Sequence, residues 1–110
     1  MESLKNTFFQ LLKNYTDNVS LISELWVEVK TCYTAKDRHY HTLQHLDYLL
    51  AQLVDIKSEI QNWNAILFTL YYHDIVYNAI NTDNEEQSAV LAKQRMEQIM
   101  VPNAIIELCY

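Results

Sequence analysis

The chain has 110 residues, a net charge of −6, an apolar half and no glycine. Its eight Lys and Arg residues give no basic cluster for the phosphates of nucleic acid, so bulk nucleic acid is disfavoured as a partner, though a nucleotide is not. The lack of glycine excludes Gly-rich phosphate loops and disfavours β-hairpins. The length suits one hydrophobic core, and we expect one all-α domain over residues 1–110.

Apolar residues recur at helical spacing from the N-terminus onward. The stripe from Leu4 to Tyr15 predicts a first helix with Ser3 as its N-cap. A second helix is predicted from about Ser20 to Tyr33, followed by a polar loop at 34–38. Since no apolar stretch reaches signal-peptide or membrane-span length, we expect a soluble, cytoplasmic protein that does not enter the membrane.

A third helix is predicted to begin near His41 or Thr42, and residues 55–62 to form its fraying end and a connection. Almost every residue from Trp63 to Val76 is apolar or aromatic, which predicts a central helix buried on most sides. The side chains of the third helix expected to face the core are Leu46, Leu49, Leu50, Leu53 and Val54.

Residues 78–83 predict a turn-rich loop, after which Asn84 is expected to cap a helix that lasts to about Met100. Pro102 ends that helix, and an apolar segment begins at Ala104. Cys32 and Cys109 lack the spacing of a disulfide or metal motif and are expected to be buried thiols. The predicted inner side of the last long helix carries Ala89, Val90, Ala92 and Met96.

Three histidines and one aspartate form two clusters typical of a metal site. His41 and His45 are four residues apart, so they share one helix face, and the pair His73-Asp74 follows 28 residues beyond His45. On a regular helix, His73 and Asp74 diverge by about 100°, so both reach one ion only if it lies in the angle between them. We expect a divalent ion there, and the residues do not distinguish Zn, Mn, Fe, Mg or Ni.

The proposed ligands are His45, His73 and Asp74. Three protein ligands leave positions open for water and substrate, which is typical of a catalytic ion. Such an ion lowers the pKa of bound water toward about 7, and His41 is then placed to protonate the leaving oxygen. The pattern indicates metal-assisted hydrolysis.

Three blocks of sequence, Arg38–Leu46, Tyr72–Tyr77 and Asn84–Ala89, resemble the metal-dependent phosphohydrolases of the HD superfamily. The resemblance implies an HD-domain-like helical bundle that hydrolyses a phosphate ester or nucleotide, with a small phosphorylated molecule as its partner. The same order is similar, at a greater distance, to the cyclic nucleotide phosphodiesterase domain. That similarity implies His41 as proton donor and His45, His73 and Asp74 as metal ligands.

Two positions depart from the family pattern. Tyr77 stands where the phosphodiesterases have a further histidine, which argues against a second metal held in their manner. The superfamily also uses a later aspartate on a C-terminal helix, and no aspartate follows Met100. We therefore expect this chain to be the N-terminal portion of an HD-type domain.

Several readings stay open. Glu85 either orients His41 and water at the metal, as the resemblance implies, or is an acid favoured by a helix dipole. Arg38 either binds a substrate phosphate or pairs with a surface acid. A non-catalytic helical module that binds a metal or nucleotide for regulation or protein interaction is the alternative function, and a homo-oligomer is compatible with the sequence. Aromatic residues expected in the core rather than stacked on bases are Trp26, Trp63, Phe68, Tyr71, Tyr72 and Tyr77.

Overall fold

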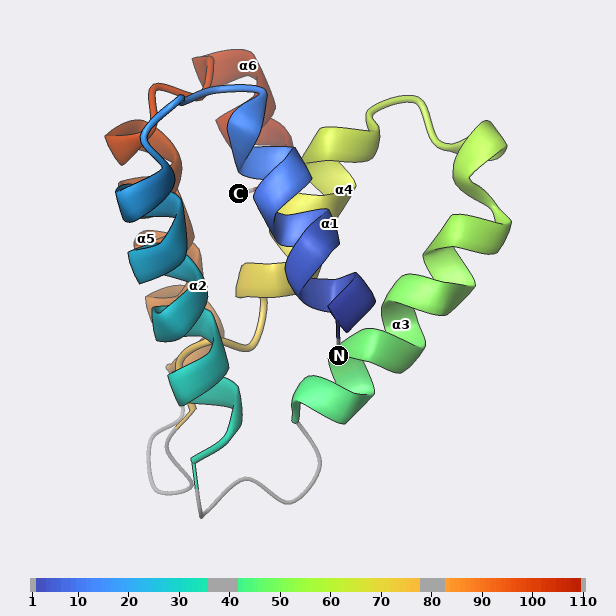
Figure 1. The fold of residues 1–110 in the computed structure, drawn as a ribbon, viewed down its shortest axis with the longest axis horizontal. Helices are drawn as coiled ribbons and strands as arrows, with labels where there is room; N and C mark the ends of the chain where they lie inside the picture. The colour runs from blue at the N-terminus through green and yellow to red at the C-terminus, as the bar shows by residue number, and fades with distance from the viewer. Residues whose placement is uncertain (1, 36–41, 78–82, 110) are drawn as a thin grey trace.

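The computed structural model describes residues 2–35, 42–77 and 83–109, and within these ranges it contains helices and no strand, which confirms the all-α prediction (Figure 1). A short 3₁₀ turn, η1, occupies Lys57–Glu59 in the connection after the third helix. The α-helices are α1 (Glu2–Lys13), α2 (Val19–Tyr33), α3 (Leu43–Asp55), α4 (Trp63–Tyr72), α5 (Asn84–Gln98) and α6 (Asn103–Cys109).

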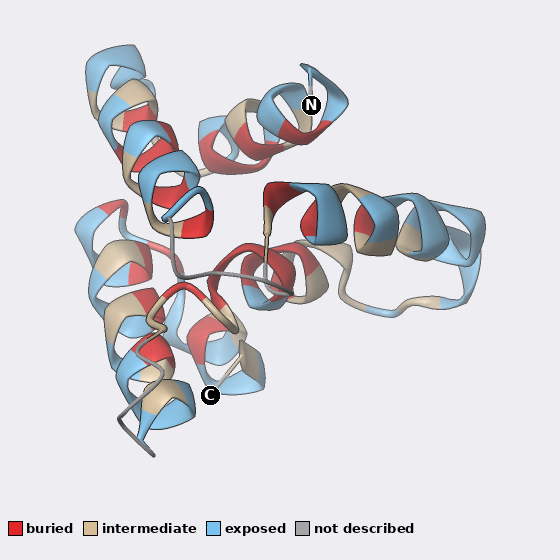
Figure 2. Ribbon diagram, turned by 90° about the horizontal axis from the view of Figure 1, so that it is seen from below, coloured by how far each residue is buried: buried red, intermediate tan, exposed pale blue. Residues whose placement is uncertain are grey.

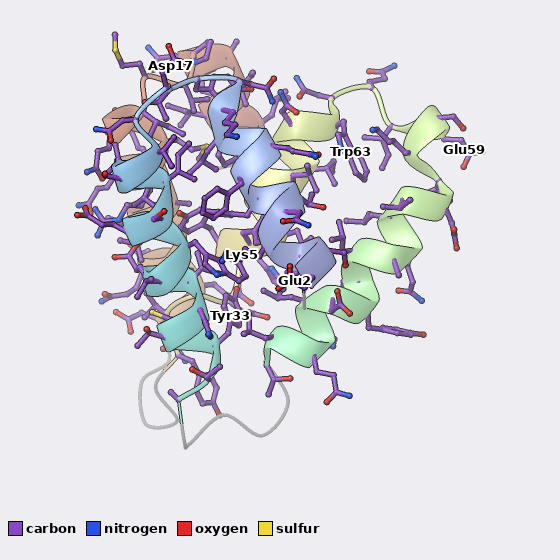
Figure 3. All side chains as sticks on the ribbon, viewed as in Figure 1. Glu2, Lys5, Asp17, Tyr33, Glu59 and Trp63 are labelled. Atoms are coloured by element: carbon purple, nitrogen blue, oxygen red, sulfur yellow. The ribbon has the colours of Figure 1, made fainter. Side chains whose placement is uncertain are left out.

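Helix α4 is the centre of the arrangement, as its apolar sequence predicts. It packs against α1, α3, α5 and α6, while α1 also packs against α2 (Figure 1). The buried faces of these helices point inward, and α3 projects to one side with a largely exposed outer end (Figure 2). Trp63 lies at the start of α4 (Figure 3). The Nζ atom of Lys57 in η1 lies 5.1 Å from the centroid of its ring.

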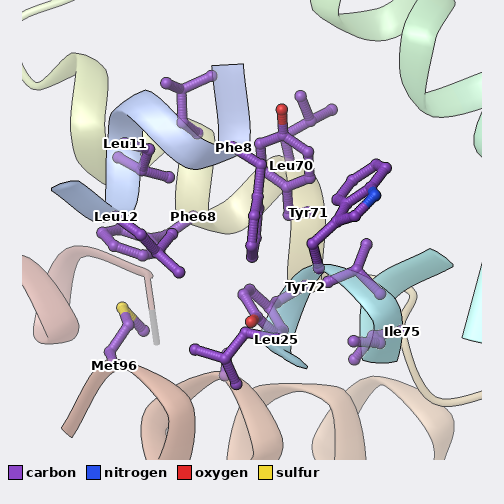
Figure 4. Packing of buried hydrophobic residues seen from close by; sticks show 14 of the residues in the cluster. Phe8, Leu11, Leu12, Leu25, Phe68, Leu70, Tyr71, Tyr72, Ile75 and Met96 are labelled. Carbon is purple, nitrogen blue, oxygen red and sulfur yellow. The ribbon is translucent and has the colours of Figure 1, made fainter. Parts of the chain in front are cut away.

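The core is built around Phe8 of α1, which is fully buried. Its ring contacts that of Tyr71 edge-on (Figure 4), with 4.9 Å between the ring centroids. The ring centroid of Trp26 lies 5.6 Å from that of Phe8. Phe68 and Tyr72 are buried in the same cluster, so the core interpretation of these aromatic residues is confirmed. The two remaining members of the aromatic set, Trp63 and Tyr77, are half-buried.

Polar side chains cap the starts of three helices. Asn18, Thr42 and Asn62 each accept a hydrogen bond from a backbone N–H three residues later, at 3.1, 3.3 and 3.1 Å. The predicted start of the third helix near Thr42 is thereby confirmed. Ser3 is not an N-cap as expected, because α1 already begins at Glu2 and the Ser3 hydroxyl lies 3.4 Å from Asp47 Oδ1 instead.

The start of α5 lies one residue from the predicted cap. Asp83 occupies the N-cap position and Asn84 is the first helical residue. The side chain of Gln87 donates to Asp83 Oδ2 at 2.9 Å, so the contact expected from a capping motif is made with the neighbouring residue.

Two residues predicted to face the core are exposed. Val54 is 53% exposed because it lies in the last turn of α3, on the outer part of the helix. Val90 is 42% exposed because the inner stripe of α5 runs through Ser88, Ala92 and Met96, which are buried. Both cysteines are half-buried rather than buried.

Helix α5 ends at Gln98, two residues before the predicted limit, in a Schellman turn. The N–H of Met100 donates to the carbonyl of Glu97 at 3.0 Å, and the N–H of Val101 donates to that of Met96 at 2.9 Å. Met100 has a φ of 63°, the left-handed conformation that glycine usually supplies and that this chain must give to another residue. The turn directs α6 back against α4.

Candidate functional site

A cavity of about 280 Å³ lies between α4, α5 and α6. The Sγ–H of Cys109 in α6 donates to the carbonyl of Ala65 in α4 at 3.2 Å. This contact holds α6 against α4 at the edge of the cavity. Three residues singled out in the sequence, His73, Asp74 and Glu85, line this cavity together. The other lining residues are Phe68, Thr69, Tyr72, Ser88, Ala89, Ala92 and Cys109.

His73 lies where α4 ends, and each of its two ring nitrogens lies within hydrogen-bond distance of an oxygen atom. The Nδ1 atom lies 2.9 Å from the carbonyl oxygen of Leu70 and 3.2 Å from that of Thr69, and carbonyls only accept, so Nδ1 carries a proton. The Nε2 atom lies 2.9 Å from Asp74 Oδ2. The ring is thus oriented by the last turn of α4, with Nε2 directed toward the carboxylate.

This geometry raises the pKa of His73 above its ordinary value of 6.5. The hydrogen bond to Asp74 is the largest cause, and its charge and the bonds to the Leu70 and Thr69 carbonyls act in the same direction, while partial burial opposes them. With an acceptor at each ring nitrogen, the imidazolium form satisfies both.

The regular helix assumed for His73 and Asp74 does not continue through both residues, because α4 ends at Tyr72 and not at Val76. His73 is the C-cap residue, and Asp74 belongs to the turn that follows. His73 keeps helical backbone angles, with φ −62° and ψ −31°, and the two side chains point toward each other, with Nε2 and Oδ2 2.9 Å apart. Their donor atoms are therefore adjacent.

Glu85 and His45 occupy different surroundings. Glu85 is exposed in the first turn of α5 and lines the cavity on the side opposite α4. His45 is exposed in the first turn of α3 and is not among the residues that line the cavity. His41 and Arg38, expected to donate a proton and to bind phosphate, lie outside the described residues.

The donor atoms present fit a divalent ion in part. A histidine whose Nδ1–H is bonded to a backbone carbonyl and whose Nε2 lies beside a carboxylate has the arrangement common to metal-binding histidines. In the described ranges, however, no three His, Cys, Asp or Glu side chains gather closely enough to hold a metal. Two of the three predicted ligands are adjacent, and His45 stays a prediction as the third.

Two hydroxyl groups beside the cavity were not assigned a role from the sequence. Tyr33 donates to the carbonyl of Tyr71 at 3.0 Å and accepts from the N–H of Asp74 at 3.2 Å. Ser88 accepts from the N–H of Val76 at 2.9 Å. The sequence signal that could have identified them is a polar residue on the apolar, inward-facing side of a helix.

Comparisons with family models, curated proteins and solved structures find no match to this chain. Among the helices of the described residues, none combines the length and the apolar character needed to cross a membrane.

Proposed function

We propose that this chain forms an HD-type helical domain that hydrolyses a small phosphate ester, such as a nucleotide, with the help of a divalent metal ion. The observation that carries the proposal is the contact of 2.9 Å between His73 Nε2 and Asp74 Oδ2 at a cavity that also includes Glu85. These residues come from two of the three sequence blocks that resemble the superfamily, so separate motifs share one concave site.

Each residue of the proposed site has an expected role. His73 and Asp74 would hold the ion, with His45 as the expected third ligand. A bound divalent ion would polarise a phosphoryl oxygen of the substrate and lower the pKa of a bound water molecule. Glu85, which lines the same cavity, would accept a hydrogen bond from water, and His41 is expected to give its proton to the leaving oxygen. Arg38 is expected to bind a phosphate oxygen through its planar guanidinium.

A second candidate is a helical module that binds a metal or nucleotide without catalysis. It is favoured by the finding that only two of the expected ligands are adjacent within the described part of the chain. Two ligands bind an ion more weakly than three, which suits reversible sensing better than a resident catalytic ion.

The test is elemental analysis of protein purified without added metal. Wild type is compared with His73→Ala, Asp74→Asn and the matched control Asp55→Asn, which changes an exposed acid at the end of α3. Wild type and Asp55→Asn should retain metal, and the two site variants should lose it. Negligible metal in all four proteins contradicts the metal site.

Activity separates the two candidates. The metal-loaded wild type is incubated with phosphate monoesters, phosphodiesters and nucleotides, and the products are measured: inorganic phosphate from a monoester, and a new phosphate monoester from a diester. Hydrolysis that Asp74→Asn abolishes and Asp55→Asn retains supports the enzyme. A metal-loaded protein that hydrolyses none of them supports the binding module.

A further inference from the structure

The turn that carries His73 and Asp74 departs from the hydrogen-bond pattern of a helix after its first residue. The N–H of His73 donates to the carbonyl of Thr69 at 2.9 Å, and that of Ile75 donates to the carbonyl of Tyr72 at 3.3 Å. The backbone N–H groups of Asp74 and Val76 donate instead to side-chain hydroxyls from other helices. The conformation of this turn therefore depends on residues distant in the sequence.

Tyr33 anchors the first half of the turn. It stands at the end of α2 and its side chain is 1% exposed (Figure 3). Its hydroxyl donates to the carbonyl of Tyr71 and accepts from the N–H of Asp74, at 3.0 and 3.2 Å. The hydroxyl oxygen of Tyr33 thus links the last turn of α4 to the backbone of Asp74. This contact fixes the position of the backbone from which the Asp74 side chain extends.

Ser88 anchors the second half. It is fully buried on α5, three residues after Glu85. Its Oγ accepts from the N–H of Val76 at 2.9 Å and lies 3.3 Å from the carbonyl oxygen of the same residue. Since residues three apart on a helix are neighbours, Glu85 lies one helical turn from this contact.

We propose that Tyr33 and Ser88 are positioning residues for the metal site, and that their hydroxyls hold the His73-Asp74 pair in its ligating geometry. The inference rests on the proposed function, since it concerns the same site. Partners that orient metal ligands contribute about 10- to 100-fold to metal affinity. The two hydroxyls act on the backbone that carries the ligands, and neither needs to touch the ion.

The experiment removes each hydroxyl alone, as Tyr33→Phe and Ser88→Ala. The matched control is Tyr71→Phe, which deletes an equally buried hydroxyl that donates to the carbonyl of Leu4 at 2.6 Å, away from the turn. Affinity is measured by titration with Co²⁺ followed by its visible absorption, and stability by urea unfolding. Each protein is also examined without metal by amide hydrogen exchange.

We expect Tyr33→Phe and Ser88→Ala to weaken Co²⁺ binding by about 10-fold or more, while Tyr71→Phe stays within about 2-fold despite a comparable loss of stability. In the metal-free protein, Tyr33→Phe should accelerate exchange of the Asp74 amide, and Ser88→Ala that of Val76. Wild-type affinity in both variants, or an equal loss in Tyr71→Phe, overturns the inference.

The proposed function fails separately, if wild type does not bind Co²⁺. In that case the inference fails as a statement about metal, and the amide exchange rates still decide whether the two hydroxyls hold the turn.

Discussion

The contact between His73 and Asp74 makes a prediction about the metal-free protein that does not depend on catalysis. A double-mutant cycle with His73→Gln, Asp74→Asn and the double variant isolates the coupling between the two side chains. Because the pKa of His73 is raised in the folded protein, the imidazolium is more stable there than in the unfolded chain. The coupling should be fully present below about pH 6.5 and lost as the pH rises through the folded pKa of His73.

The magnitude follows from the separation and exposure of the two groups. Two unit charges 2.9 Å apart attract by about 1.4 kcal/mol in water. The side chains are 36% and 25% exposed, so solvent screens them and ordering both has an entropic cost. A coupling of about 0.5 to 1 kcal/mol is therefore expected at pH 5.5, in the range of partly exposed ion pairs.

The assay is urea unfolding of the four proteins in the presence of a chelator, at pH 5.5 and again at pH 9. The free energy of coupling should fall toward zero at the higher pH. A coupling that is equal at both pH values, or larger at pH 9, refutes the view that His73 and Asp74 form an ion pair through the imidazolium.

Two further substitutions test the packing that surrounds the site. Phe8→Ala should lower the free energy of unfolding by about 3 to 5 kcal/mol, since it empties the space beside Trp26, whereas the half-buried neighbour Phe9→Ala should cost about 1 to 2 kcal/mol. Equal losses in urea unfolding would contradict this account of the core. Met100→Gly should raise the melting temperature by relieving the left-handed backbone, a gain of about 0.5 to 1 kcal/mol, while Gln98→Gly within the helix should lower it by a similar amount. A Met100→Gly protein that melts below wild type argues against strain at this turn.

The order of the motifs predicts the candidate site residues, and the packing of the helices decides how these residues are arranged. His73 and Asp74 stand out in the sequence as an adjacent pair and Glu85 through the family resemblance, and the structure places all three at one cavity. Their mutual geometry could not be predicted from a regular helix. Helix α4 ends at Tyr72, and the largely apolar sequence through Val76 conceals that end.

The hydrogen-bond partners of the Tyr33 and Ser88 hydroxyls cannot be predicted from the sequence, for a related reason. A tyrosine or serine on the inner face of a helix is compatible with many partners, and only the packing of α2 and α5 around the end of α4 selects the backbone of Asp74 and Val76. Helix boundaries at Ser3 and Asn84 were misplaced by one or two residues, because several neighbouring polar side chains can cap a helix.

By itself, the sequence determined that the described chain is helical and that α4 is central. The reason is local: helical spacing of apolar residues, polar caps and the absence of glycine act within a few neighbours along the chain. Tertiary structure alone decided that His73 faces Asp74, that Glu85 shares their cavity and that Tyr33 and Ser88 hold the turn. These contacts join helices distant in the sequence, and a backbone N–H that leaves a helix takes the acceptor that packing brings to it.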